Sequence, residues 1–362
     1  MNGSLEFETR QNATPVAVAE REALLANLGF GRTFTDHMVS ISYSDGKGWY
    51  DARLEPYAPL RMDPATAVLH YAQSIFEGLK AYRAPDGGVV MFRPDANAAR
   101  FVRSAERMAM PPLPPELFLH SLRVLIEQDR DWVPGSGESS LYLRPIQYAS
   151  EVYLGVRPAL QYQFLVLASP VGAIFAGGAK PCSIWLEREN NRSGPGGTGA
   201  AKCGGNYASS LLAQAEAMRH GCEQVVFLDA TEHRHFEELG GMNVFFVLGD
   251  TLVTPPLTDT ILPGITRDSV ITLARHRGLT VEERSYSIDE FRSDAASDAL
   301  TEMFACGTAA VITPIARLLS ADGEIVVGDG GSGRVTTSLR SALLDIQYGR
   351  AEDEFGWVQR IV

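Results

Sequence analysis

A lysine inside a glycine-rich stretch is the feature of this sequence best suited to chemistry. Residues 193–209 read SGPGGTGAAKCGGNYAS, and Lys202 is the only cation among them. Its small neighbours leave the amine open to a carbonyl carbon, and partial desolvation would favour its neutral, nucleophilic form. A solvated lysine in a flexible loop fits the same composition. Residue types alone therefore leave covalent carbonyl chemistry and an ordinary loop as two interpretations.

Phosphate binding is a third interpretation of the glycines, and the spacing does not favour it. A P-loop needs G-x-x-x-x-G-K-[ST], whereas Lys202 follows Ala201 and precedes Cys203. Residues 326–334, VVGDGGSGR, contain G-x-G-x-x-G between an expected strand and helix. Only 29 residues follow Gly333, too few for a dinucleotide-binding unit. We interpret residues 326–334 as a plain loop.

The sequence gives little support for a metal site or for a catalytic serine nucleophile. His233 and His235 stand beside Glu237 and Glu238, but no other histidine lies within ten residues of the pair. A G-x-S-x-G nucleophile elbow does not occur. We therefore expect no metal site.

Composition restricts the partners and the compartment. The 362 residues are 45% hydrophobic and 21% charged, with a formal net charge of −12. Such an acidic protein is not expected to bind nucleic acid or an anionic membrane, although local arginines can still bind small anions. The four cysteines include no CxxC pair, which indicates reduced thiols. The N-terminal segment has no apolar targeting stretch, so we expect a cytoplasmic protein.

A break rich in glycine and proline at residues 169–181 divides the chain into two expected parts. We expect a small N-terminal α/β domain at 1–169, a linker at 170–181, and a large C-terminal α/β domain at 182–362 that carries Lys202. Mixed strands and helices in both parts predict a two-domain fold of the α/β or α+β class.

The elements that must position these residues follow from hydrophobic periodicity and from turn and capping signals. A hairpin is expected around PDGG (85–88), Thr266 is a candidate N-cap, and Ser287 and Glu290 form a capping box. The expected strands are 141–149, 161–168, 182–187, 223–230 and 243–248, and residues 303–314 are expected to form a strand, a small-residue turn and a second strand. The expected helices are 95–110, one opened by PPLPPE, 206–221, 266–278 and 338–349.

Several long segments, in one order from about Phe30 to Gly349, resemble the branched-chain-amino-acid aminotransferases, which are pyridoxal-phosphate enzymes of fold type IV (D-amino-acid aminotransferase-like). These segments are FGRTFTDHM, LHYAQSIFEGLKAY, FRPDANAARF, LYLRP, GTGAAKCGGNYA, EELGGMN, VTPPLTDTILPGITR, MFACGTAAV and DIQYGR. The resemblance covers nearly the whole chain and favours the covalent role for Lys202.

The resemblance implies a role for each residue of a cofactor site. Lys202 would hold pyridoxal 5'-phosphate as a Schiff base, Tyr207 would bond its phenolic oxygen, and Glu238 would face its ring nitrogen. A carboxylate at that position keeps the nitrogen protonated, so that the ring can accept electrons. The phosphate would be bound by the remaining matched positions, which are Arg100, Ile265, Thr266 and Thr308.

The same resemblance implies the substrate contacts. The backbone of Thr308 and Ala309 and the hydroxyl of Tyr142 would bind the α-carboxylate, and Arg144 would meet the distal carboxylate of glutamate or 2-oxoglutarate. An apolar side-chain pocket would be formed by Phe30, Tyr71, Phe76, Tyr207 and Gly241, with Leu154 and Val156 reaching in from the partner subunit of a homodimer.

The implied activity is reversible amino transfer between L-leucine, L-isoleucine or L-valine and 2-oxoglutarate, in two half-reactions. Lys202 would act as base and acid between the substrate and the cofactor.

Some relatives carry a redox CxxC after the GTA turn, whereas this chain has Ala310 and Thr313 there and Cys306 before the turn. Gly241 stands where some relatives have threonine.

Two alternatives remain open from the residues. A D-amino-acid aminotransferase or aminodeoxychorismate lyase would share the lysine and the glutamate, but these proteins are generally shorter and lack FGRTFTDHM. A non-catalytic protein could instead hold a nucleotide in the glycine loop. Covalent attachment of a cofactor at Lys202 would exclude the non-catalytic nucleotide-binding protein. Activity with L-leucine, and not with D-alanine, would exclude a D-amino-acid aminotransferase.

Overall fold

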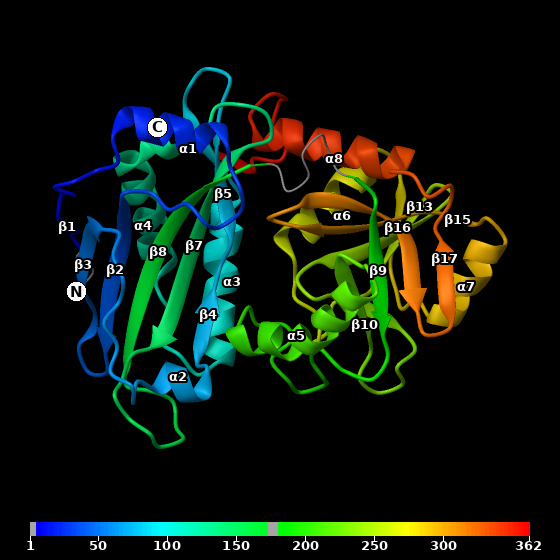
Figure 1. Ribbon diagram of the computed structural model, residues 1–362, viewed down its shortest axis with the longest axis horizontal. Helices are drawn as coiled ribbons and strands as arrows, with labels where there is room; N and C mark the ends of the chain where they lie inside the picture. Colours follow the sequence, from blue (N-terminus) through cyan, green and yellow to red (C-terminus); the bar gives the residue numbers. More distant parts are fainter. Residues whose placement is uncertain (1–4, 173–179) are drawn as a thin grey trace. The chain divides into compact units, whose positions relative to one another are not determined.

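The computed structural model describes residues 5–172 and 180–362, and their contacts group into two compact units (Figure 1). The first unit holds residues 5–172, 201–204 and 346–362, and the second holds 180–200 and 205–345. Residues 201–204, which include Lys202, make their contacts in the first unit although they lie within the expected C-terminal domain. The expected linker falls mainly on residues 173–179, outside the described residues, and stays a prediction.

The first unit is built on a mixed sheet with the strand order β1-β3-β2-β8-β7-β5-β6-β18, and β4 pairs with β7 beside this path. Antiparallel pairing connects neighbours from β3 to β18. The strands are β1 (Glu8–Thr9), β2 (His37–Ser44), β3 (Gly48–Pro56), β4 (Ser74–Phe76), β5 (Leu79–Arg83), β6 (Val89–Phe92), β7 (Ser140–Ala149), β8 (Gln161–Val171) and β18 (Val358–Arg360).

Two amphipathic helices form the core of this unit against the sheet. Helices α3 (Pro94–Arg107) and α4 (Pro115–Gln128) pack on each other, α3 packs on β4, and α4 packs on β2 and β8. The rings of Phe101, Phe118 and Phe164 meet there, fully buried. The smaller helices are α1 (Val18–Ala26), α2 (Ala67–Tyr71) and the 3-10 turn η1 (Arg130–Trp132).

The second unit is built on a sheet whose strand order is β11-β10-β9-β16-β15-β12-β13-β14. β11 also pairs with β12, so the strands from β11 to β12 close into a ring. β17 pairs with β16. The strands are β9 (Cys182–Glu187), β10 (Gln224–Leu228), β11 (Phe236–Leu239), β12 (Asn243–Leu248), β13 (Thr251–Thr254), β14 (Thr280–Glu283), β15 (Leu300–Gly307), β16 (Val311–Ser320) and β17 (Gly323–Val326).

The helices of this part of the chain are α5 (Gly204–Arg219), α6 (Ile265–His276), α7 (Ile288–Ala296) and α8 (Arg334–Gln347). Helix α6 packs on β14 and β15, and α7 packs on β15 and β17. Phe236, Phe246 and Phe291 are fully buried and in ring contact. No helix among the described residues has the length and apolar character needed to cross a membrane.

Most of the expected elements are confirmed, and one cap is wrong. The hairpin around PDGG is the pair β5–β6, and the capping box has both of its hydrogen bonds. Helix α6 begins at Ile265 with Gly264 as its N-cap, so Thr266 lies inside the first turn. Thr266 was favoured because threonine caps helices often, but here the extended backbone before the helix runs through Gly264.

The loop with the G-x-G-x-x-G pattern serves the start of helix α8. Gly328, Gly330 and Gly333 have positive φ angles, which glycine adopts without strain. The carboxylate of Glu302 accepts hydrogen bonds from the backbone N–H groups of Val335 and Thr336 at 2.9 and 2.8 Å. A side chain of the chain itself therefore occupies the helix N-terminus where a phosphate would bind.

Candidate active site

Lys202 is fixed through its backbone to the first unit. Its N–H donates to Ser104 Oγ on helix α3 at 3.0 Å, and its carbonyl accepts from the N–H of Phe76 on β4 at 3.0 Å. The next residue, Cys203, forms an isolated bridge with Ile75. The lysine is thus held at a strand edge and is not part of a flexible loop.

Two cations lie over the ring of Phe76. Lys202 Nζ and the guanidinium carbon of Arg144 are each 4.8 Å from its centroid. Arg144 also donates to the hydroxyl of Tyr142 at 3.0 Å, and the ring of Tyr142 meets that of Phe30 at 5.3 Å. The first unit therefore brings together the expected amine, the expected carboxylate-binding arginine and three aromatic residues of the expected substrate site.

Gly78 allows this arrangement. A Cβ atom at Gly78 would collide with the Tyr142 hydroxyl, so only glycine permits the approach of that side chain. Tyr142 is nearly buried, whereas Phe30 is 43% exposed.

A buried ion pair holds Arg100. Its Nε and Nη2 donate to the two carboxylate oxygens of Glu77 at 2.7 and 2.8 Å, and Asn97 donates to the same carboxylate at 2.7 Å. Glu77 is fully buried and Arg100 is 4% exposed. Burial raises the pKa of Glu77, but Arg100, together with the charge of Lys202, brings that pKa below its usual value. Arg100, the expected phosphate cation, is thus oriented through a bidentate contact.

We expect Arg100→Met to lower the free energy of unfolding of the cofactor-free protein by about 3–5 kcal/mol, because the variant leaves Glu77 as an unpaired buried charge. Urea denaturation measures this loss. The double variant Glu77→Gln/Arg100→Met removes both charges and should recover more than half of it. A single variant within about 1 kcal/mol of wild type would contradict this account of the pair.

The remaining pocket residues of the first unit lie at an exposed edge. The Tyr71 hydroxyl donates to the backbone carbonyl of Leu154 within the same chain. Tyr71, Leu154 and Val156 are 40%, 59% and 87% exposed. The exposure of Leu154 and Val156 is what a contact with a second subunit would require, and that contact stays a prediction.

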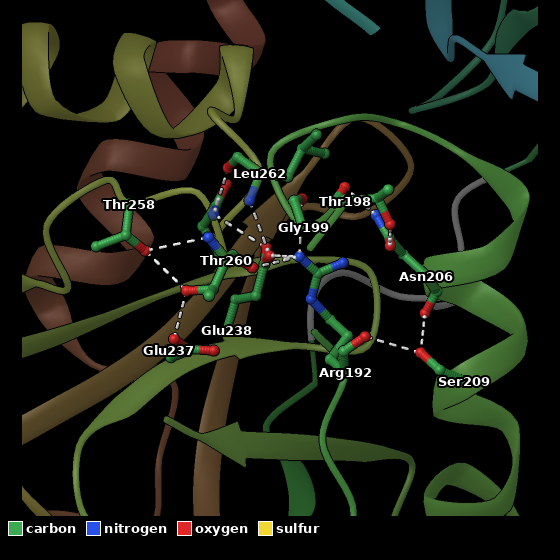
Figure 2. A network of polar contacts seen from close by, with 11 residues as sticks. Arg192, Thr198, Gly199, Asn206, Ser209, Glu237, Glu238, Thr258, Thr260 and Leu262 are labelled. Carbon is green, nitrogen blue, oxygen red and sulfur yellow. Dashed lines mark hydrogen bonds and ion pairs between the residues drawn. The ribbon is translucent and has the colours of Figure 1, made fainter. Parts of the chain in front are cut away.

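Glu238 lies on β11 of the second unit, nearly buried, with a carboxylate held by several donors. Leu262 N–H donates to Oε1 at 2.9 Å and Asn243 Nδ2 donates to Oε2 at 3.2 Å. Arg192 forms an ion pair with the same carboxylate (Figure 2). Three donors stabilise the negative charge of this side chain and fix its direction.

The neighbouring Glu237 has a different environment. It accepts a hydrogen bond from the Thr260 hydroxyl, and burial raises its pKa. Successive strand residues point to opposite sides of a sheet. The two acids of EELGGMN are therefore distinct, and the second has the charge-stabilising set of donors.

The start of helix α6, which carries the expected cofactor residues Ile265 and Thr266, lies near the hydrogen-bond partner of Glu238. Asn243, its partner, pairs with Cys306 across the sheet, and a Cβ at Gly264 would collide with the Asn243 side chain. The first turn of α6, with Ile265 and Thr266, therefore begins beside this strand pair. Its N-cap residue, Gly264, makes no side-chain hydrogen bond to the first turn, so the first N–H groups suit an anion.

The turn with Thr308 and Ala309 joins β15 to β16 near Gly241. A Cβ at the preceding Gly307 would lie 3.6 Å from the carbonyl of Gly241, and one at Gly241 would lie 3.6 Å from the ring of Tyr207. The second unit thus brings Tyr207 on α5, Gly241 and this turn close together.

Three residues that the structure places in these clusters were missed by reasoning from the sequence. Glu77 could have been noticed as an acid in the otherwise apolar segment SIFEGL. Ser104 and Arg192 carry no such signal, because their partners lie far away in the chain.

The two candidate metal-binding histidines lie in a different setting. His233 and His235 belong to a turn closed by Asp229, whose carboxylate accepts hydrogen bonds from backbone N–H groups. These bonds bring the pKa of Asp229 to about 2, against the opposing effect of burial. No group of histidine, cysteine and acidic side chains suited to a metal ion occurs in the part of the chain that the structure describes.

Comparison with known proteins gives a consistent result. The family model for amino-transferase class IV matches residues 74–318. The branched-chain-amino-acid aminotransferase of Mycobacterium tuberculosis is 55% identical over 365 aligned positions, covering 99% of each chain. A probable branched-chain-amino-acid aminotransferase of Streptomyces coelicolor is also 55% identical, with 98% of each chain covered.

Solved structures agree with the sequence relatives. The branched-chain amino acid aminotransferase of Escherichia coli superposes with a TM-score of 0.74 at 31% identity, covering 90% of this chain and all of that one. A second branched-chain amino acid aminotransferase, solved with pyridoxamine 5'-phosphate, has a TM-score of 0.74 at 27% identity, covering 90% of this chain and 99% of that one. The expected two-domain fold type IV is confirmed.

Proposed function

The chain belongs to the class IV aminotransferases, and from this premise we propose that it is a branched-chain-amino-acid aminotransferase. It transfers the amino group of L-leucine, L-isoleucine or L-valine reversibly to 2-oxoglutarate, giving branched 2-oxo acids and L-glutamate. The observation that carries this proposal is 55% identity, over the full length, to enzymes of that name.

The cofactor is pyridoxal 5'-phosphate, and the chemistry of the donors fits it. Lys202 offers an amine, Glu238 an ionised carboxylate for a protonated ring nitrogen, and Arg100 a fixed guanidinium for a phosphate. The uncapped start of α6 adds backbone N–H groups at Ile265 and Thr266. When bound, the cofactor takes up the amino group and draws electrons from the substrate α-carbon.

We assign the protein's part of the reaction to a few side chains. Lys202 would attach the cofactor through its amine and, once released by the substrate amine, would move the proton from the substrate α-carbon to the cofactor. Tyr207 would donate to the phenolic oxygen and Thr308 would contact the phosphate. Glu238 keeps the ring nitrogen protonated, which is the role its three donors support.

Substrate recognition must serve an aliphatic chain and a carboxylate in one pocket. We assign the α-carboxylate to the Tyr142 hydroxyl and to the backbone of Thr308 and Ala309. Arg144, stacked on Phe76, then meets the distal carboxylate of 2-oxoglutarate. Its position at the face of an aromatic ring lets an apolar side chain pack nearby when no carboxylate is present. The apolar wall comprises the remaining expected residues Phe30, Tyr71, Tyr207 and Gly241, with Leu154 and Val156.

Replacing Arg144 with methionine should impair the reaction with 2-oxoglutarate much more than the reaction with L-leucine. We expect the KM for 2-oxoglutarate to rise about 10- to 100-fold, because a charge-assisted contact is lost. The half-reaction with L-leucine should change by less than about threefold. Single-turnover absorbance with each substrate measures both values, and equal losses for both would refute the assignment.

We also propose a homodimer in the cytoplasm. The exposed apolar side chains of Val152, Leu154 and Val156 support a contact with a second subunit. All four cysteines are free thiols, which supports a reducing compartment.

The function is tested by following purified protein with L-leucine and 2-oxoglutarate. We expect L-glutamate to form, and the protein to absorb visible light from its bound cofactor. Borohydride should fix the cofactor on Lys202. Glutamate from D-alanine but not from L-leucine would instead support a D-amino-acid aminotransferase, and absence of a cofactor adduct would reject both.

A further inference from the structure

Arg192 is a buried arginine that enters the site assigned above only through its contact with Glu238. Its side chain and that of Glu238 are each only 4% exposed, and the two form an ion pair within the second unit. A buried charge without a partner is costly, so such pairs persist where the geometry satisfies both groups. The hydrogen-bond partners of Arg192 show how its charge is satisfied.

One nitrogen of Arg192 joins three segments of the chain (Figure 2). Besides Glu238, its Nη2 donates to the carbonyl of Gly199 at 3.0 Å and to the carbonyl of Thr260 at 2.8 Å. Gly199 lies three positions before Lys202, and Thr260 lies two before Leu262, whose N–H also binds Glu238. The guanidinium therefore connects the loop that leads to the lysine with the loop that supports Glu238.

The two loops approach each other so closely that only glycine fits at position 199. A Cβ at Gly199 would collide with the backbone of Thr260. The two carbonyls consequently lie together and present one concave acceptor site to Arg192. The two N–H groups of Nη2 match the two carbonyls, and the charge of the guanidinium faces the carboxylate of Glu238.

The backbone that carries Arg192 is fixed as well. Its carbonyl accepts from Ser209 Oγ on helix α5 at 2.8 Å. Thr198 and Asn206 exchange two hydrogen bonds at 2.6 and 2.7 Å, which attaches the end of the glycine-rich loop to the same helix (Figure 2). These contacts fix the backbone at Arg192 and at the end of the glycine-rich loop, from which the guanidinium and its Gly199 acceptor extend.

The positive charge of Arg192 affects the ionisation of the nearby carboxylates. Glu237 and Glu238 are consecutive acids, and the charge of Arg192 acts on both. Without that charge, the buried carboxylate of Glu238 would keep the neutral donors Asn243 and the N–H of Leu262, and its ionised form would be less favoured. The arginine therefore stabilises the ionised form of the acid that faces the ring nitrogen, and it also sets its direction.

We propose that Arg192 is a positioning residue that acts through Glu238, holding its carboxylate charged and directed at the ring nitrogen of the cofactor. This inference rests on the proposed function. It adds to that function a residue that touches neither the substrate nor the reacting atoms, but determines how well the cofactor ring stays protonated.

The test compares Arg192→Met in the wild-type chain and in a Glu238→Gln chain, with the visible absorption of the bound cofactor as the readout. In the wild-type chain we expect the affinity for pyridoxal 5'-phosphate to fall about tenfold or more. We also expect the midpoint of the pH titration of the absorption band to move to higher pH, because a Glu238 that is less ionised stabilises the positive charge on the ring nitrogen less, and loss of that nearby positive charge raises the pKa of the titrating group. In the Glu238→Gln chain, Arg192→Met should change the affinity by less than about twofold and the titration midpoint by less than about 0.3 pH units.

Two control variants distinguish an effect on the position and charge of Glu238 from a general structural effect of removing an arginine. Arg188→Met removes an exposed arginine four positions earlier, which pairs with Asp322, and should leave the spectrum unchanged. Arg192→Lys keeps the charge but not the planar geometry, and its titration should fall between wild type and Arg192→Met. If Arg192→Met does not fold, the lysine variant in the two chains gives the same comparison.

Equal effects of Arg192→Met in both chains would overturn the proposal, since the arginine would then act without Glu238. An unchanged titration in the wild-type chain would overturn it as well. Failure of the wild-type protein to bind pyridoxal 5'-phosphate or to form glutamate would instead reject the proposed function itself.

Discussion

Replacing Lys202 with alanine is expected to lower the rate of amino transfer by about 10⁴-fold or more. The variant loses the amine at the face of Phe76, which both attaches the cofactor and moves the proton. Glutamate formation from L-leucine and 2-oxoglutarate measures the loss. Mass spectrometry after borohydride reduction should find no cofactor adduct on the variant.

The sequence makes this experiment unusually clear, because the chain has only four lysines, Lys47, Lys80, Lys180 and Lys202. Lys47→Ala is the matched control, since that lysine lies in a surface turn over the ring of Tyr50. It should retain full activity and a wild-type adduct. Residual activity of the Lys202 variant near wild type, or an adduct elsewhere, would contradict the assignment.

Replacing Glu238 with glutamine is expected to lower kcat about 100- to 1,000-fold while the cofactor remains attached. Glutamine has nearly the same shape, but it cannot stabilise a protonated ring nitrogen, so the cofactor draws electrons less strongly. It also leaves Arg192 without its carboxylate partner. Rates of the two half-reactions, followed by absorbance, measure the effect on the chemical step.

Glu237→Gln is the control for that variant, one residue away on the same strand. Burial already raises the pKa of Glu237, so a neutral amide changes its charge less, and Thr260 can still donate to the amide oxygen. We expect its kcat within about threefold of wild type. If Glu237→Gln were the more damaging change, the ring nitrogen would have to be assigned to the first acid of the pair.

The sequence by itself determined the features that depend on neighbouring residues. Ser287 and Glu290 formed their capping box, and the PDGG turn closed the β5–β6 hairpin, because capping and turn geometry are set within a few residues. The PPLPPE segment likewise marked the start of helix α4, which begins at Pro115, because proline is compatible with the first helical turn. Resemblance over nearly the whole chain then determined the family and the cofactor chemistry.

Only the tertiary structure decided which charges meet. Arg100 and Glu77 are 23 positions apart, and Arg192 and Glu238 are 46 apart, yet both pairs are buried. Closing such loops depends on the packing of entire strands and helices, for which local patterns carry no information. The start of α6 at Ile265, and not at a cap on Thr266, was decided in the same way, by the path of the backbone past Asn243. Neighbouring residues thus specify the elements and the reactive lysine, whereas the charge environment of the cofactor site is specified by long-range packing.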